Sequence, residues 1–297
     1  MNRSLAVNRN AVSVFEVLAD YAALTKPRLL SMVLLSTAVG FYLGFGSSAL
    51  SGSFFVVMMA TALVAGGSMA LNQYLERASD AKMIRTQNRP IPSGRIQARE
   101  ALVFGSVISL SGFFIFIFWI NWVSTLLALV TWASYLFVYT PLKSRTSLST
   151  VVGALPGALP PVIGWAAAQG TVNFQAALLF WIIFFWQMPH FLSIAWMYRA
   201  DYERAGQPIL SVIDREGHLV ARQMIVYMCA LLPVSLLPSL FMLTGVPYFF
   251  GAFVLGICFA SVVIFAAPNL DLRARYVLRA SVAYLAVLLM LMVIDKI

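Results

Sequence analysis

Side chains that carry oxygen recur at helical spacing at the start of the stretch NQYLERASDAKMIRTQNRP, residues 72–90. Asn72, Glu76 and Asp80 follow one another at intervals of four, so on a continuous helix they form one stripe that rises about 6 Å per step. Carboxylate and amide oxygens suit a hard cation, and Mg²⁺ binds through one or two carboxylates while it bridges substrate phosphates. The spacing therefore predicts a site for Mg²⁺ and a diphosphate. The alternative is a solvated helix end whose acids pair with nearby cations.

Cationic side chains follow this stripe directly. Lys82, Arg85 and Arg89 come within the same stretch, ahead of a turn that contains Pro90. Arginine matches phosphate oxygens in a bidentate manner, and lysine adds a mobile point charge. Carboxylates, a bound metal ion and these cations together predict a clamp for a diphosphate group.

A second charged stretch, HFLSIAWMYRADYERAGQPILSV, begins at His190 and carries Asp201 between Tyr198 and Tyr202. Asp201 is a second candidate metal ligand. On a straight helix His190 lies about 16 Å from Asp201, so the two cannot share one ion unless the helix breaks between them. Two interpretations of His190 stay open: a hydrogen-bonded histidine of the bundle, or a functional group, because ionisable residues inside a membrane are functional candidates.

Membrane-spanning helices must position these groups, because 61% of the 297 residues are hydrophobic and only 10% are charged. Apolar runs of about 20 residues, enough to cross a bilayer, predict an all-α integral membrane protein with about nine transmembrane helices. Only Asn121 and the neighbouring Trp119 and Trp122 separate the third helix from the fourth, which leaves eight helices as the alternative. The predicted ranges are 29–46, 53–71, 101–119, 122–140, 151–168, 175–198, 222–243, 247–267 and 277–295.

Lysine and arginine residues fall on alternate connections of a nine-helix arrangement, with Lys296 as the one exception among twenty. By the positive-inside rule the N-terminus and both charged connections are then cytoplasmic. We expect a bacterial plasma (inner) membrane protein with lipid around it. The net charge of +9 follows from this topology and from attraction to anionic headgroups, so it gives no support for nucleic-acid binding.

The chain divides into two predicted parts. Residues 1–28 form a cytoplasmic N-terminal segment, in which 11–24 have the apolar spacing of a helix on the membrane surface. Residues 29–297 form one transmembrane domain. Within the run 151–168, three prolines and three glycines predict a bent helix that neighbours approach closely.

The same stretches resemble a known family. NQYLER at 72–77 with Asp80, followed by MIRTQNRP at 83–90, is similar to the first signature of the UbiA superfamily of intramembrane prenyltransferases. Further stretches resemble one branch of it, the protoheme IX farnesyltransferases or haem O synthases. They are LTKPR at 24–28, YTPLKSRT at 139–146, TVVGALPGALPPVIGW at 150–165, QMPHF at 187–191 and DYERAGQPIL at 201–210.

The resemblance implies transfer of the farnesyl group of farnesyl diphosphate to a vinyl group of haem B, with water added and diphosphate released. It implies Mg²⁺ as cofactor, and the family leads us to expect haem A synthase or a terminal oxidase as a partner. By position it assigns Mg²⁺ to Asn72, Glu76, Asp80 and Asp201. It assigns phosphate oxygens to Lys82, Arg85, Arg89 and Lys143, the haem or its water to His190, and the second motif to the pair Tyr198 and Tyr202.

Two other functions remain as alternatives. Another UbiA-type aromatic prenyltransferase, of a quinone or chlorophyll pathway, shares the metal and diphosphate site, but the QMPHF and DYERAG stretches argue against it. A secondary transporter also uses broken helices and intramembrane charges. The acids here instead cluster at one membrane edge, which favours the enzyme.

Overall fold

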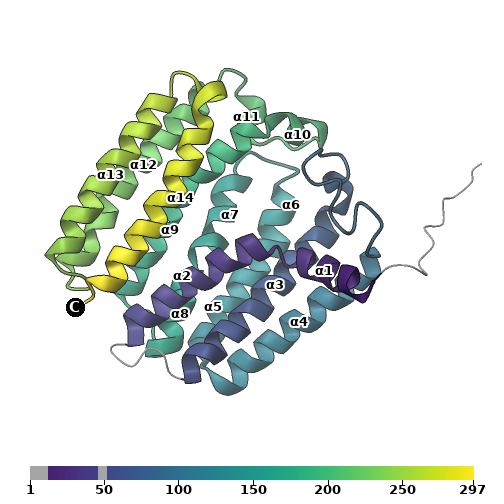
Figure 1. Ribbon diagram of the computed structural model, residues 1–297, viewed down its shortest axis with the longest axis horizontal. Coiled ribbons are helices and arrows are strands. Elements are labelled where there is room, and N and C mark those ends of the chain that lie inside the picture. Colours follow the sequence, from purple (N-terminus) through teal and green to yellow (C-terminus); the bar gives the residue numbers. More distant parts are fainter. Residues whose placement is uncertain (1–12, 46–51) are drawn as a thin grey trace, which may run out of the picture.

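The chain folds into long helices joined by short connections (Figure 1). The structure is a computed structural model that describes residues 13–45 and 52–297. Over these ranges the only extended backbone pairing is an isolated bridge between Thr244 and Lys296. The helices are α1 (Val14–Leu24), α2 (Pro27–Phe45), α3 (Gly52–Asp80), α4 (Ala98–Trp119), α5 (Trp122–Ala133), the π-helix η2 (Ser134–Tyr139), α6 (Thr140–Leu142), α7 (Ser149–Ala158), α8 (Pro160–Gln169), α9 (Phe174–Met197), α10 (Arg199–Arg204), α11 (Leu210–Ile213), α12 (His218–Leu240), α13 (Val246–Ala266) and α14 (Leu270–Ile294).

Nine helical segments within the described ranges are long and apolar enough to cross a membrane. The prediction of about nine spans is confirmed, and the eight-helix alternative is wrong. α4 and α5 are separate because the chain turns at Asn121, whose side-chain oxygen accepts the backbone N–H of Ser124 and caps α5. The fourth span combines α5, η2 and α6, and the fifth combines α7 and α8. The chain is thus an all-α multi-pass membrane protein.

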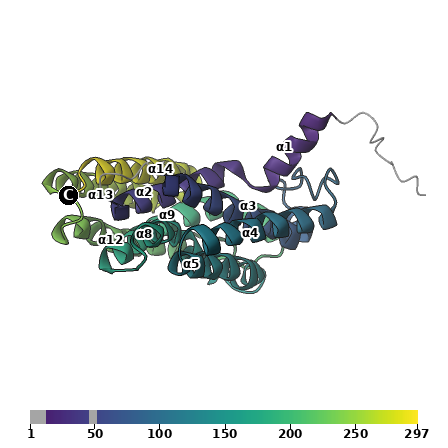
Figure 2. The ribbon, with the colours of Figure 1, turned by 90° about the horizontal axis from the view of Figure 1, so that it is seen from below.

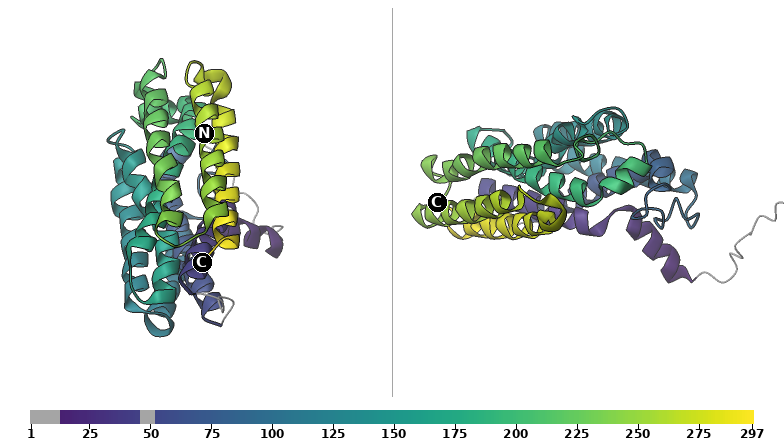
Figure 3. Two further views of the ribbon diagram at one scale, coloured as in Figure 1. Left: turned by 90° about the vertical axis from the view of Figure 1, so that its left-hand side faces the viewer. Right: turned by 90° about the horizontal axis from the view of Figure 1, so that it is seen from above.

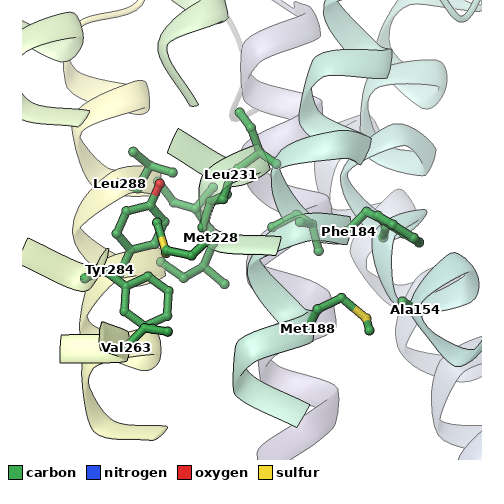
Figure 4. Close-up of a cluster of buried hydrophobic side chains, with 14 of the residues drawn as sticks. Ala154, Phe184, Met188, Met228, Leu231, Val263, Tyr284 and Leu288 are labelled. Atoms are coloured by element: carbon green, nitrogen blue, oxygen red, sulfur yellow. The ribbon is translucent and has the colours of Figure 1, made fainter. Parts of the chain in front are cut away.

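The spans lie side by side in a bundle, with α9 and α12–α14 on one side and α2–α5 on the other (Figures 1 and 3). The largest apolar core joins α9 to the three C-terminal helices. Side chains such as Met188, Met228, Val263 and Tyr284 meet in it (Figure 4). Large apolar side chains also face outward, among them Leu110 and Ile117 of α4. Such an exposed apolar surface suits contact with lipid.

α3 continues well past residue 71, the predicted end of its span, and ends at Asp80. The charged stripe therefore lies on the last turns of a regular helix. The end is closed by the connection that follows, because Thr86 Oγ1 donates a hydrogen bond of 2.8 Å to the backbone carbonyl of Asp80. Carbonyls at a helix end need such partners. The hydrogen bond from Thr86 holds the connection close to the end of α3 that carries the stripe.

α1 leaves the bundle at the end that carries this connection (Figure 2). It begins with a capping box, in which Ser13 Oγ accepts the N–H of Glu16 and the Glu16 carboxylate accepts the N–H of Ser13. Val14, Phe15 and Leu18 are exposed. The helix covers the described part of the predicted segment 11–24, of which residues 11 and 12 lie outside the described residues. Its contact with the membrane surface stays a prediction.

α2 and α8 lie in backbone contact through glycines. A Cβ atom at Gly40 would stand 1.9 Å from the carbonyl oxygen of Pro161, and one at Gly164 would stand 2.0 Å from the carbonyl oxygen of Thr37. Both are far inside van der Waals contact. Gly40 of the first span and Gly164 of the fifth therefore allow the close approach that the sequence predicts.

We expect Gly40→Ala to lower the free energy of unfolding by about 1–3 kcal/mol, because α2 and α8 must separate to admit the methyl group. Thermal unfolding of the detergent-solubilised protein measures this. Gly52→Ala is the control, since a Cβ at Gly52 meets nothing within 4 Å. Equal unfolding temperatures for the two variants would contradict the argument.

Candidate active site

A cavity of about 910 Å³ lies among α2, α3, α5, η2, α7, α8 and α9. Its volume falls within the range of about 300–1,000 Å³ that is usual for small-molecule sites. The polar side chains that line it come mainly from the end of α3 and the segments near it: Lys26, Asn72, Glu76, Asp80, Arg85, Arg89 and Lys143. Much of the remaining wall is apolar and includes Val64, Phe116, Trp132, Ile163 and Phe191. One space thus joins a charged end to an apolar chamber.

The three members of the stripe, Asn72, Glu76 and Asp80, all line this cavity and are only 1%, 7% and 3% exposed. Each has one cationic partner from another part of the chain. Lys26 Nζ donates to Asn72 Oδ1 over 2.8 Å, Lys143 Nζ lies 3.0 Å from Glu76 Oε1, and Arg89 Nη1 lies 2.6 Å from Asp80 Oδ2. The acids do pair with cations, as the alternative interpretation requires. They are nevertheless buried in a cavity wall, and a solvated helix end does not describe them.

Positive charge exceeds negative charge at this end of the cavity, because the lining contains more cationic side chains than carboxylates. Burial lowers the pKa of Lys26 to about 7, and the nearby Arg89 guanidinium acts in the same direction. Burial would also lower the pKa of Lys143, but Tyr139 and Glu76 raise it above its ordinary value. A buried site with this excess of positive charge favours an anionic ligand.

Lys26 was not among the candidate residues of the sequence analysis. It lies between α1 and α2 with a left-handed backbone (φ 48°), a conformation that side chains other than glycine seldom adopt. Such backbone outliers concentrate at functional sites. The signal available in the sequence was the stretch LTKPR, in which Lys26 directly precedes the first span. Its distance of 46 residues from Asn72 hid the contact.

The π-helix η2 supplies a second group that sequence reasoning missed. Tyr135 and Tyr139 both line the cavity and stack on each other, with ring centroids 5.6 Å apart. Thr140 Oγ1 accepts a 3.0 Å hydrogen bond from the Asn72 amide and donates to the carbonyl of Tyr135. π-helical turns are rare and occur often at functional sites. The signal was Pro141, whose missing N–H interrupts the regular helical hydrogen bonds.

Asp201 does not line the cavity. Its carboxylate oxygens each lie 3.2 Å from a backbone N–H, of Ile84 and of Arg85, and it also pairs with Arg204. Burial would raise the pKa of Asp201, but the Arg85 N–H, the Arg204 side chain and the Ile84 N–H lower it below its ordinary value. Asp201 thus anchors the connection that carries Arg85 and Arg89. Its role as a metal ligand stays a prediction.

The remaining members of the second motif divide between the cavity and the surface. Tyr202 lines the cavity, and its ring centroid lies 5.9 Å from Lys143 Nζ. Tyr198 lies outside, where the Arg85 guanidinium sits 5.0 Å from its ring centroid. Lys82 is exposed and also lies outside the cavity. The structure therefore brings Arg85, Arg89 and Lys143 to the charged end but not Lys82.

His190 lines the cavity from α9. α9 ends at Met197 and α10 follows, so the helix does break before Asp201. The two residues still do not share the cavity wall. Nδ1 of His190 lies 2.8 Å from Ser281 Oγ of α14, so the side chain is both hydrogen-bonded within the bundle and open to the cavity.

The donor set at the charged end fits a hard divalent cation. Glu76 uses one carboxylate oxygen for Lys143 and Asp80 uses one for Arg89, and the other oxygen of each has no hydrogen-bond partner among the described residues. No group of three His, Cys, Asp or Glu side chains within 13–45 and 52–297 is placed to hold a metal ion by itself. Mg²⁺ commonly takes one or two carboxylates and completes its shell with phosphate oxygens and water. Two free carboxylate oxygens therefore suffice.

The sequence matches a known family over most of its length. Residues 33–292 match the UbiA prenyltransferase family. The chain is 45% identical over 287 residues to Protoheme IX farnesyltransferase of Solibacter usitatus (strain Ellin6076), which covers 93% of this chain and 98% of that protein. It is 34% identical over 282 residues to the protein of the same name from Aquifex aeolicus (strain VF5), with 95% and 96% covered.

Solved structures agree in fold. A structure of digeranylgeranylglyceryl phosphate synthase has a TM-score of 0.78 at 16% identity and covers 94% of this chain and 98% of its own. A UbiA homolog from Archaeoglobus fulgidus bound to DMAPP and Mg²⁺ has a TM-score of 0.67, also at 16% identity, with 92% and 97% covered. The arrangement of spans is thus shared, although few residues are identical. On the match over 33–292 and on its relatives, this chain belongs to the UbiA prenyltransferase family.

Proposed function

We propose that this membrane enzyme is a haem O synthase, which transfers the farnesyl group of farnesyl diphosphate to a vinyl group of protohaem IX, adds water and releases diphosphate. The observation that carries the proposal is one cavity in which a cation-rich end adjoins an apolar chamber. The names of its relatives support the donor and the acceptor. Haem B and farnesyl diphosphate are both largely apolar molecules with an anionic end, as this cavity requires.

In this proposal the stripe of α3 receives the diphosphate. The free oxygens of Glu76 and Asp80, with the amide of Asn72, would hold Mg²⁺, which neutralises charge on the departing diphosphate. The solved relative bound to DMAPP and Mg²⁺ supports a metal-dependent site of this kind. Asp201 would act on the same site indirectly, because it anchors the connection that carries Arg85 and Arg89.

The cationic side chains would share the phosphate oxygens. Lys26, Arg89 and Lys143 now pair with the stripe, and Arg85 lines the same space. When a diphosphate binds, these groups can donate to its oxygens and release the oxygens of the stripe. Donors that are already in place where charge develops lower the barrier without reorganisation during the reaction. Lys82 would contribute only from the surface.

The apolar chamber would hold the farnesyl chain and the haem away from bulk water. The allylic C–O bond breaks with its electron pair left on diphosphate, and the vinyl π electrons form the new C–C bond. The positive charge then lies beside the porphyrin ring, where one water adds and loses a proton. Tyr135, Tyr139 and Tyr202 line the space near the charged end and would shield the cation until the vinyl group reacts.

The setting of the enzyme is proposed on the same grounds. The distribution of lysine and arginine residues supports a cytoplasmic N-terminus and cytoplasmic active-site connections. The membrane would be a bacterial inner membrane. Residues 29–297 would be one catalytic transmembrane domain, with α1 on the membrane surface. A haem A synthase or a terminal oxidase would take the product.

The function is tested by incubating the detergent-solubilised protein with haem B, farnesyl diphosphate and Mg²⁺ and identifying the haem product by mass spectrometry. We expect haem O, its loss when a chelator is added, and its return with excess Mg²⁺. Product formation that is insensitive to the chelator would contradict the metal assignment. No haem product from folded protein that binds haem B would contradict the proposed acceptor.

A further inference from the structure

His190 of α9 forms a hydrogen bond to α14, and no sequence motif in the C-terminal helices predicts this contact. Its Nδ1 lies 2.8 Å from Oγ of Ser281, which is fully buried. One turn earlier on α9, Trp186 Nε1 donates a 2.6 Å hydrogen bond to the backbone carbonyl of the same serine. The Trp186 and His190 rings stack, with centroids 5.1 Å apart. Ser281 is therefore the point at which α14 fixes the histidine.

These contacts favour one tautomer of the imidazole over the other. The single hydroxyl proton of Ser281 is used in a 2.7 Å hydrogen bond to the carbonyl of Leu278. Both hydrogen bonds of Ser281 are made together only when its oxygen accepts from His190 and Nδ1 bears the hydrogen. In a neutral imidazole the other nitrogen, Nε2, is then unprotonated and carries a lone pair.

Nε2 is available to a ligand. His190 lines the cavity, and no hydrogen bond to Nε2 occurs among the described residues. Histidines that bind a metal almost always donate their other ring N–H to a fixed acceptor, which sets the tautomer and the ring orientation. A neutral imidazole is also the ordinary axial ligand of haem iron. Here the acceptor is Ser281, and the imidazole lines the cavity in which the haem would lie.

We propose that Nε2 of His190 binds the iron of the haem substrate as an axial ligand, and that Ser281 is the positioning residue that holds it for this task. The inference rests on the proposed function and deepens it, because an iron–nitrogen bond fixes the centre of the porphyrin relative to the charged end. The core around Met188 and Tyr284 keeps α9 and α14 in register near this pair (Figure 4). The vinyl group is then held in a fixed orientation relative to the allylic carbon, which favours the reaction between them.

The chain allows a clean spectroscopic test, because it has two histidines. His218 is exposed, lies beside Glu216 and is not among the residues that line the cavity, so His218→Ala is the matched control. The protein is purified with a tag that lacks histidine and titrated with ferric haem B, and absorption and electron paramagnetic resonance spectra are recorded. We expect imidazole-ligated spectra from wild type and His218→Ala. His190→Ala should lose this signature, and added free imidazole should restore it.

Ser281 is tested by haem affinity. We expect Ser281→Ala to bind haem B about 10–100-fold more weakly, because the loss of such a supporting partner typically costs that much. Ser281→Thr keeps the hydroxyl and should restore the affinity. The control is Ser36→Ala, since Ser36 is a buried serine of α2 whose hydroxyl bonds only the Met32 carbonyl. A merely structural role for Ser281 would change the unfolding temperature without changing the spectrum of bound haem.

The outcomes separate this inference from the proposed function. If wild-type protein farnesylates haem B but His190→Ala gives an unchanged spectrum, the ligation is wrong and the function stands. The same holds if bound haem shows no nitrogen ligand in wild type, in which case His190 is left to accept a hydrogen bond from water. If wild type shows the His190 ligand but no farnesylated haem, the haem site exists and the proposed reaction fails.

Discussion

Asp80→Ala is expected to lower kcat/KM for haem farnesylation by at least about 100-fold, the loss that follows removal of one group that stabilises developing charge. The variant removes the free carboxylate oxygen at the end of the stripe and leaves Arg89 without its 2.6 Å partner. Both effects act at the charged end of the cavity. Initial rates at several Mg²⁺ and farnesyl diphosphate concentrations, with the haem product quantified by mass spectrometry, measure the effect.

Two variants accompany Asp80→Ala. Asp80→Asn keeps the shape and loses the charge, so we expect it to be nearly as inactive. Asp271→Ala removes an acid that is 61% exposed and paired with Arg199, and it should leave turnover close to wild type. Unfolding temperatures establish that each variant is folded. Wild-type turnover in folded Asp80→Ala would contradict the assignment of Asp80 as a ligand of Mg²⁺.

The pair of Lys143 and Glu76 gives the second large effect. Lys143→Met leaves the Glu76 carboxylate buried without a partner, since Glu76 is 7% and Lys143 is 16% exposed. We expect a loss of about 3–5 kcal/mol in the free energy of unfolding. We also expect turnover to fall by about 100-fold, because a donor to the phosphate oxygens is removed. Thermal unfolding and the farnesylation assay are made on the same preparations.

The double variant Glu76→Gln/Lys143→Met separates stability from catalysis. With no buried charge left unpaired, its free energy of unfolding should return close to that of wild type, whereas turnover should stay low. Arg95→Met is the control for loss of an ion pair, because Arg95 is 46% exposed beside Asp20, and such pairs contribute about 1 kcal/mol or less. Recovery of turnover in the double variant would show that neither side chain serves the reaction.

The sequence alone determined those features that depend on neighbouring residues. Hydropathy over about 20 residues is a local property, so the nine spans and the all-α class followed from it. The spacing of Asn72, Glu76 and Asp80 was enough to place them on one face, because helical periodicity fixes that relation as soon as α3 continues to Asp80. The turn chemistry after α3 also kept Arg89 near, nine residues from Asp80.

Only the tertiary structure decided which distant groups meet. Lys26 reaches Asn72 across 46 positions, Lys143 reaches Glu76 across 67, and Ser281 reaches His190 across 91. The contacts of Asp201 with the backbone N–H groups of Ile84 and Arg85 are likewise tertiary, and its role as a metal ligand stays a prediction. No periodicity relates residues on different helices. Their contacts depend on how α2, α9 and α14 pack, and that packing is set by side-chain volumes and close backbone approaches, such as those at Gly40 and Gly164, summed over the whole bundle.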